Sequence, residues 1–361
     1  MTKQHSNLMK LLVAHCLVLL FFSCRLWGEQ NTIPDSERIF IFEHPTNLRE
    51  PGAKKVRGKD EKRANGGNLV FVARMPKSWN PKSDKEARSS GKPSARGIIA
   101  FSSHDTKEEI IREMTKKAGY QYLIDLADKY NLAVVSWSYI GGYDNEKNYD
   151  EIEKNEFAKN SKRFDAIANE WEKGYRRFLS LYNLPKKDAM LYGVSAGAQV
   201  AHRIAMRKPQ YFSGIFIHVN SSYDAPAKEA SKLLWCVSTG EYEYGYSSAE
   251  RFYKKALDLG YCAIFKPFEN TGHFVTDDVK ELCAAFFEYL ITFIADYTNP
   301  DWKEPPVDKY YLMKYPAYIG DYQNQIAYPF EAAERKIPER KYMVSMPTKK
   351  IAQAWGEIIE E

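Results

Sequence analysis

A glycine-rich segment near the middle of the chain contains the serine best suited to act as a nucleophile. Residues 193–197 read Gly-Val-Ser-Ala-Gly, after a short apolar run and before an alanine-rich segment with helical periodicity. This order predicts a strand, a sharp turn at Ser195 and a helix, with glycines where strand and helix crowd together. The turn would expose the Ser195 hydroxyl at a helix N-terminus, where the backbone N–H of Ala196 can stabilise a developing oxyanion.

A serine hydroxyl becomes a good nucleophile only when a neighbouring base accepts its proton. His273 is the only histidine that follows His218 in the chain. It lies in a loop between the last expected strand and a closing helix, which is where a sheet of this kind would present a base. The sequence therefore predicts that His273 activates Ser195.

The base in turn needs a carboxylate that fixes its tautomer and stabilises the imidazolium. The strand expected at residues 233–237 runs into a loop that contains Glu241 and Glu243. Glu243 is preferred because it lies three residues after Gly240, a common position for this acid. Glu241 is the main alternative, and Asp224, which follows the preceding strand, is a more distant one.

Other residues near the ends of the expected strands are candidates for the rest of the site. Ser102 and Ser103 end a strand, and the backbone of either one, or of the next residue, could donate a second hydrogen bond to the oxyanion. His202 lies two turns along the helix after Ser195 and is expected to pack or to face solvent. Aromatic rings near the site could stack on sugar or phenolic rings. The residues expected to line the pocket are His104, Trp137, Tyr139 and His218, with Tyr143 nearby.

The segments that must position these residues alternate between strands and helices, which predicts an α/β fold with a mostly parallel central sheet and helices on both faces. Residues 80–96 are rich in Lys, Ser and Pro and are expected to form a loop. A long polar loop at 140–160 follows the end of a strand, where α/β sheets bind ligands. Strands are expected at 68–74, 97–101, 132–137, 189–192, 214–219, 233–237 and 262–265, and helices at 164–182, 252–259 and 279–294.

The two ends of the chain differ from this central domain. Lys3 and Lys10 precede an apolar run at 11–22, which is typical of a secretory signal peptide ending near residue 28 and is short for a membrane span. The protein is therefore expected to be secreted or periplasmic, with a lipid anchor at Cys24 as an alternative. Residues 29–67 would form an arm or edge strand, 68–298 the catalytic domain, and 299–361 an extension packed on the core, with a helix containing Trp355.

Composition excludes some classes of function. The net charge of +5 is modest for 361 residues and is spread along the chain, so no nucleic-acid partner is expected. After the signal peptide only Cys236, Cys262 and Cys283 remain; they are interpreted as buried thiols, although the first two could pair across neighbouring strands. Their spacings suggest no metal site, and no metal or cofactor is expected.

Several segments together resemble the α/β-hydrolase superfamily, and within it the secreted esterases related to polyhydroxybutyrate depolymerases and to feruloyl or acetyl-xylan esterases. The resemblance covers about residues 68–297. The segment 101–104 reads Phe-Ser-Ser-His where the family usually has His-Gly, and the acid would be Glu rather than the usual Asp. The matching segments are Phe71-Val72-Ala73-Arg74-Met75-Pro76, Gly193-Val194-Ser195-Ala196-Gly197-Ala198, Pro209-Gln210-Tyr211-Phe212-Ser213-Gly214 and Gly272-His273.

The resemblance implies an exported serine hydrolase that cleaves carboxylic esters through an acyl-enzyme. Ser195, His273 and Glu243 would form the triad, and the backbone of Ala196 would belong to the oxyanion hole. The substrate would be a small-molecule ester or an ester linked to a polysaccharide. Two alternatives remain open: a serine peptidase of the prolyl-oligopeptidase type, and a binding protein that keeps the fold without catalysis.

Overall fold

The computed structural model describes residues 35–46, 68–103, 110–111, 114, 119–138, 156–293 and 315–360. The expected signal peptide and Cys24 lie outside these residues, as do His104, Tyr139 and Tyr143. In the part of the chain that is described, no helix combines the length and the apolar character needed to cross a bilayer.

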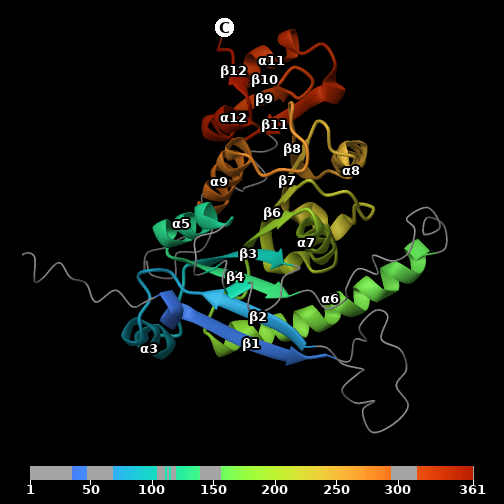
Figure 1. Cartoon of the computed structure of the whole chain (residues 1–361). Coiled ribbons are helices and arrows are strands. Elements are labelled where there is room, and N and C mark those ends of the chain that lie inside the picture. Colours follow the sequence, from blue (N-terminus) through green and yellow to red (C-terminus); the bar gives the residue numbers. More distant parts are fainter. Residues whose placement is uncertain are drawn as a thin grey trace, which may run out of the picture. The chain divides into compact units, whose positions relative to one another are not determined.

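The central element is an eight-stranded sheet with the strand order β1-β2-β4-β3-β5-β6-β7-β8 (Figure 1). Strands β3 to β8 run parallel, whereas β1 and β2 are antiparallel to their neighbours. The predicted α/β class with a mostly parallel sheet is thus confirmed. The strands are β1 (Ile39–Pro45), β2 (Asn68–Arg74), β3 (Gly97–Ser103), β4 (Leu132–Ser138), β5 (Ala189–Val194), β6 (Phe212–His218), β7 (Leu234–Gly240) and β8 (Cys262–Phe268).

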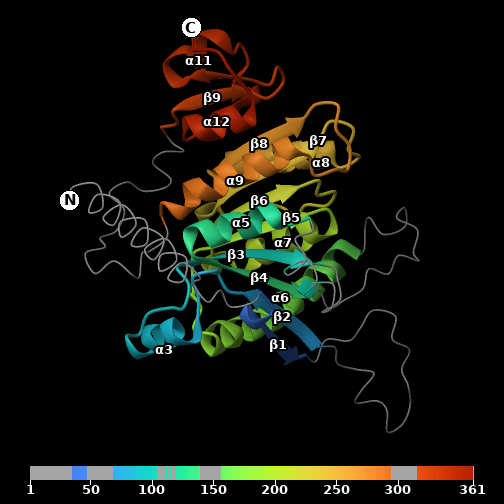
Figure 2. The same ribbon diagram turned by 60° about the vertical axis from the view of Figure 1, so that its left-hand side comes forward.

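Helices cover both faces of this sheet. Helices α5 and α9 lie on one face, and α6, α7 and α8 lie on the other (Figures 1 and 2). The α-helices of the central part are α3 (Pro81–Ser89), α5 (Gln121–Tyr130), α6 (Glu156–Leu181), α7 (Ala196–Arg207), α8 (Tyr246–Asp258) and α9 (Asp277–Ile291). Short 3-10 turns are η1 (Asp35–Arg38), η3 (Pro209–Tyr211), η4 (Lys228–Lys232) and η5 (Arg340–Tyr342).

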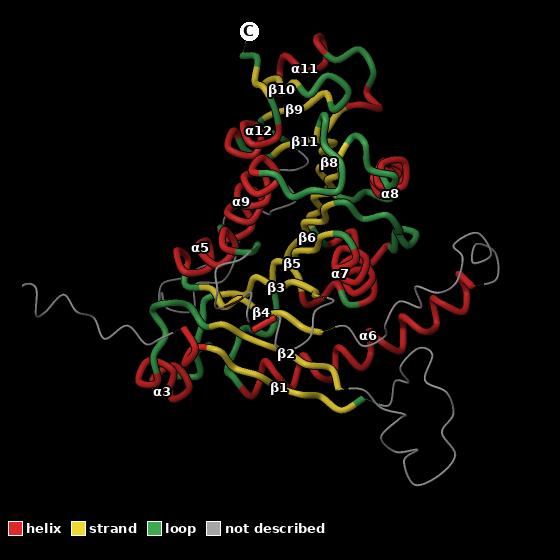
Figure 3. Tube along the Cα trace, viewed as in Figure 1, coloured by secondary structure: helices red, strands yellow, loops and turns green. Residues whose placement is uncertain are grey.

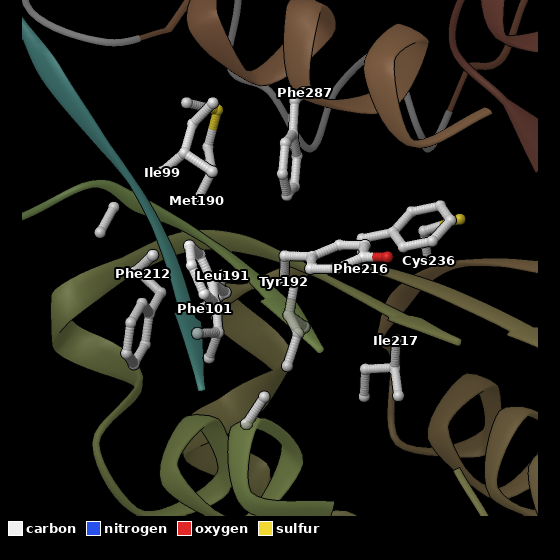
Figure 4. Packing of buried hydrophobic residues seen from close by; sticks show 14 of the residues in the cluster. Ile99, Phe101, Met190, Leu191, Tyr192, Phe212, Phe216, Ile217, Cys236 and Phe287 are labelled. Carbon is white, nitrogen blue, oxygen red and sulfur yellow. The ribbon is translucent and has the colours of Figure 1, made fainter. Parts of the chain in front are cut away.

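The core lies on both sides of the central strands because successive side chains of a strand point to opposite faces. Ile99 and Met190 are partners in neighbouring strands and face Phe287 of α9, whereas Ile217 points to the opposite face (Figure 4). All four side chains are fully buried. Two apolar faces explain why these strands appear in the sequence as continuous hydrophobic runs rather than as alternating patterns.

The segment 80–96 was expected to be a loop, and this prediction is wrong because the helix α3 lies within it. The Asn80 side chain accepts a hydrogen bond from the Ser83 N–H, and the Ser83 hydroxyl in turn accepts one from the Asn80 N–H. Pro81 stands at the first helical position, where its missing N–H costs nothing. The helix has no buried residue, so no apolar periodicity marks it in the sequence.

The last part of the chain forms a second sheet that the sequence did not predict (Figure 3). Its strand order is β11-β9-β10-β12. The expected helix containing Trp355 is confirmed as α12, and the Trp355 Nε1–H donates to the Phe265 carbonyl of β8 at 2.8 Å. The elements are β9 (Tyr318–Asp321), β10 (Ile326–Pro329), α11 (Phe330–Lys336), β11 (Met343–Met346), α12 (Lys349–Trp355) and β12 (Glu357–Ile358).

Of the three cysteines after the expected signal peptide, Cys236 and Cys283 are buried and Cys262 is partly buried. Cys236 and Cys262 do lie in neighbouring strands, but the register pairs Cys236 with Ile264 and Cys262 with Leu234. The alternative of a disulfide between them is therefore wrong. Burial raises the pKa of both Cys236 and Cys283, which keeps these thiols protonated and unreactive.

Candidate active site

The turn between β5 and α7 has the strained geometry that the glycine-rich segment predicts. Ser195 is the residue before the first turn of α7 and has φ 53° and ψ −127°, a conformation that non-glycine residues rarely adopt. A Cβ on Gly193 would lie 2.7 Å from the Ala198 Cα, and one on Gly197 would lie 2.6 Å from the Ser102 carbonyl oxygen. Both glycines are therefore required by close approach of the backbone.

Ser195, His273 and Glu243 form a continuous chain of hydrogen bonds. The His273 Nε2 lies 2.7 Å from the Ser195 Oγ, and the His273 Nδ1 lies 2.7 Å from the Glu243 Oε2. A carboxylate only accepts, so the Nδ1–H donates to Glu243 and the Nε2 lone pair is left to accept the serine proton. The Glu243 side chain is 2% exposed and that of His273 is 45% exposed, so the base is open to a substrate and its acid is not.

The other two carboxylates considered for the acid have different partners. The exposed Glu241 accepts a hydrogen bond from the Asn270 N–H at 3.0 Å, and Asp224 forms ion pairs with Arg203 and Arg207. Of the three, Glu243 is the one that contacts His273.

A glycine allows the loop of the acid to meet the loop of the base. A Cβ on Gly240 would collide with the Thr271 carbonyl oxygen. The Tyr242 N–H donates to that same carbonyl at 2.9 Å. The loops after β7 and β8 are thus joined through their backbones.

The residues expected to form the oxyanion hole lie at the meeting point of β3 and α7. The N–H of Ala196 belongs to the first turn of α7, where helical N–H groups have no intrahelical acceptor. The Ser102 carbonyl packs against Gly197, so the end of β3 lies directly beside this turn. Ser103 is the last residue of β3, and the next residue lies outside the described part of the chain.

Two residues predicted to line the pocket are buried instead. Trp137 is 1% exposed, and its ring lies 5.3 Å from the ring of Trp171 of α6. Its assignment to the pocket was wrong, because it occupies the face of β4 that α6 covers. His218 is fully buried at the end of β6, next to the site but not on an open surface.

His202 packs in the interior, which was one of its two expected positions. Its Nε2 accepts a hydrogen bond from the Asp224 N–H at 2.9 Å, and its ring contacts Trp235 and Phe252. Burial lowers the pKa of His202 to about 3, so the ring is neutral near pH 7.

Three exposed aromatic side chains next to the triad candidates were not singled out from the sequence. Tyr242 and Tyr244 flank Glu243 and are 68% and 80% exposed; Phe274 follows His273 and is 70% exposed. We call these three residues the aromatic rim. Their adjacency in sequence to the candidate acid and base was the available signal.

The described residues can also be judged against the requirements of a metal site. Among them, no group of three or more His, Cys, Asp and Glu side chains gathers so as to hold a metal ion. The arrangement of Ser195, His273 and Glu243 can transfer a proton from a hydroxyl to an imidazole and so generate an oxygen nucleophile.

Comparisons with known proteins find similarity at the level of solved structures only. No protein-family model matches the sequence, and no curated protein matches it. A ferulic acid esterase is 11% identical, with a TM-score of 0.41, over 70% of this chain and 96% of that chain. An S-formylglutathione hydrolase from Agrobacterium tumefaciens is 10% identical, with a TM-score of 0.43, over 70% of this chain and 94% of that chain.

A fungal esterase from Rhizomucor miehei is 11% identical, with a TM-score of 0.43, over 72% of this chain and 86% of that chain. At these scores the similarities carry no conclusion about substrate or reaction. The fold is defined by the chain's own strand order and by the turn at Ser195.

Proposed function

We propose that this chain, which has the α/β-hydrolase fold, is a serine hydrolase that cleaves carboxylic esters through an acyl-enzyme. One observation carries the proposal: the chain of two 2.7 Å hydrogen bonds from Ser195 through His273 to Glu243. The strained backbone of Ser195 supports it, because strain of this kind persists where the surrounding structure holds a side chain in a required position.

The reaction begins when the Ser195 Oγ attacks the acyl carbonyl while the His273 Nε2 takes its proton. The Ala196 N–H donates to the oxyanion of the tetrahedral intermediate. The imidazolium, stabilised by Glu243, then gives its proton to the leaving alkoxide and the acyl-enzyme forms. A water molecule activated by the same histidine attacks the acyl group, and the carboxylic acid is released.

The aromatic rim supports an ester on a ring-bearing substrate, such as a polysaccharide-linked ester. Exposed aromatic side chains offer flat faces on which sugar or phenolic rings can stack. Trp137 lends no support to this substrate because it lies in the core. We further propose that the protein is exported, as the apolar run at 11–22 indicates, with or without a lipid at Cys24.

Labelling with a fluorophosphonate tests the mechanism, because this reagent reacts only with an activated serine. We expect the wild type to be labelled, Ser195→Ala to be unlabelled, and His273→Ala to be labelled at least about 100-fold more slowly. Ser231→Ala, at a partly exposed serine in η4, is the matched control and should label like the wild type.

A folded wild-type protein that is not labelled would exclude the serine mechanism and favour the binding protein. If labelling succeeds, acetyl and feruloyl esters should be hydrolysed and prolyl peptides should not. The opposite preference would favour the peptidase.

A further inference from the structure

His218 lies where the strands that carry the candidate triad meet. It ends β6, and the register places it between Val194 of β5 and Ser238 of β7. Its backbone carbonyl accepts the Ser195 N–H at 3.0 Å, and its ring Nε2 lies 2.8 Å from the Phe274 carbonyl oxygen. One residue therefore contacts the backbone of the nucleophile and the backbone next to the base.

We propose that His218 is a positioning residue, which holds the loop of His273 in register with Ser195 through its hydrogen bond to the Phe274 carbonyl. This inference rests on the proposed function, since it assigns a part in that reaction. His218 itself does not touch the reacting atoms. It acts through the backbone that carries His273.

The protonation state of the ring follows from its two partners. A carbonyl only accepts, so the His218 Nε2 carries a proton and donates it to Phe274. The Nδ1 of the neutral ring can only accept; it lies 3.0 Å from the Ser238 Oγ, whose single proton can go to this Nδ1 or to the Ile217 carbonyl at 3.2 Å. Burial lowers the pKa of His218 to about 4, which keeps the ring in this neutral form near pH 7.

Besides the contact of Asn270 with Glu241 and the packing of Val275 on the core, two backbone carbonyls hold the loop that carries His273. Phe274 is 70% exposed, so burial of its side chain does not hold the loop. On one side of His273 the Thr271 carbonyl accepts the Tyr242 N–H, and on the other the Phe274 carbonyl contacts His218. The base thus lies between two anchors, and His218 provides the second.

The backbone directly after His218 is held in a costly conformation. Val219 has φ 47°, which is an outlier for a β-branched residue, and its N–H donates to the Ser238 carbonyl at 3.0 Å. Strain of this kind persists only where neighbours fix the chain. The backbone next to His218 is therefore held in place by its neighbours in β7.

Two substitutions separate the hydrogen bond from simple packing. His218→Gln keeps an N–H donor near the position of Nε2, whereas His218→Leu has a comparable volume and no donor. We expect His218→Leu to lower kcat on p-nitrophenyl acetate and the rate of fluorophosphonate labelling about 10–100-fold, with KM changed less than about 3-fold, because misplacement of a base affects the chemical step. His218→Gln should keep most of the wild-type kcat and labelling rate.

Cys236→Ala in β7 is the control for stability, because it removes a buried thiol from the neighbouring strand. Its kcat should stay within about 2-fold of the wild type even if its Tm falls as far as that of His218→Leu. The proposal is overturned if His218→Leu keeps the wild-type kcat. It is also overturned if the kcat of His218→Gln falls as far as that of His218→Leu when the two variants have equal Tm.

Hydrogen exchange tests the tether without any turnover. We expect the peptide spanning residues 269–276 to exchange faster in His218→Leu than in His218→Gln, in Cys236→Ala and in the wild type. Equal exchange in all four proteins would overturn the proposal. A wild type that fails to react with the fluorophosphonate would contradict the proposed function alone, and the exchange result would still decide whether His218 holds the loop.

Discussion

Two glutamates on one short loop have different roles because their surroundings differ. Glu243 is nearly buried and contacts His273, whereas the exposed Glu241 binds the backbone of Asn270. We expect Glu243→Gln to lower kcat/KM about 10²–10⁴-fold, because a neutral amide neither fixes the required tautomer nor stabilises the imidazolium. The measurement is steady-state hydrolysis of p-nitrophenyl acetate.

Glu241→Gln is the matched control, since its amide oxygen can still accept the Asn270 N–H. Its kcat/KM should stay within about 3-fold of the wild type, as is usual for exposed substitutions. If Glu241→Gln lost activity while Glu243→Gln kept it, the assignment of the acid would be reversed.

Sequence predicts a site residue well when its signal is local. Ser195 lies in a glycine motif between a strand and a helix, and His273 is the one histidine late enough in the chain. The choice between Glu243 and Glu241 depends on how the loops after β7 and β8 pack, which no local pattern encodes. Trp137 was misplaced because a fully buried strand gives no sign of which face a given side chain takes.

At the scale of elements, the C-terminal sheet contacts the edge strand of the main sheet. The Trp355 Nε1–H donates to the Phe265 carbonyl of β8, and the ring of Trp355 would lie 2.6 Å from a Cβ on Gly320. We expect Trp355→Phe to lower the free energy of unfolding by about 1–3 kcal/mol, because it leaves a buried carbonyl without its donor.

Urea denaturation followed by tryptophan fluorescence measures this loss. Leu257→Ala, at a residue that is 41% exposed, is the control and should change stability by less than about 0.5 kcal/mol. Unchanged stability of Trp355→Phe would show that the C-terminal sheet unfolds independently of β8.

The elements that sequence predicted share a strong apolar pattern. All the expected strands of the main sheet exist, with ends that differ by a few residues, because each is a continuous run of buried side chains. Helix α6 begins at Glu156 rather than near 164, since its first turns are polar and lack an apolar stripe. Strands β9 to β12 are two to four residues long, too short for a period of two to be recognised.

For the molecule as a whole, parallel strands bring distant residues to one edge of a sheet. Ser195, Glu243 and His273 follow β5, β7 and β8, whose carboxyl ends share that edge. The same packing buries His202 and His218 completely beneath it. The stability of the fold is therefore linked to the protonation of histidines that lie under the site.

The pH dependence of stability follows from these two rings. Burial lowers the pKa of His202 to about 3 and of His218 to about 4, from an unfolded value near 6.5. As the pH falls below 6.5, these two histidines bind protons in the unfolded chain but stay neutral in the folded chain. The free energy of unfolding therefore falls until the pH reaches the pKa of the folded state. The expected loss between pH 7 and pH 4 is roughly 3 kcal/mol for each ring.

Urea denaturation at pH 7.5, 6, 5 and 4 measures this dependence. His202→Gln can keep the acceptor for the Asp224 N–H but cannot titrate. Between pH 6 and pH 4 its free energy of unfolding should therefore fall less steeply than that of the wild type, with a difference in slope of roughly 1 kcal/mol per pH unit. Each protein is compared with its own value at pH 7.5, which removes any difference in packing. If the free energy of unfolding fell equally steeply with pH in both proteins, His202 would bind its proton as readily in the folded state as in the unfolded chain. Its burial would then make no contribution to the pH dependence of stability.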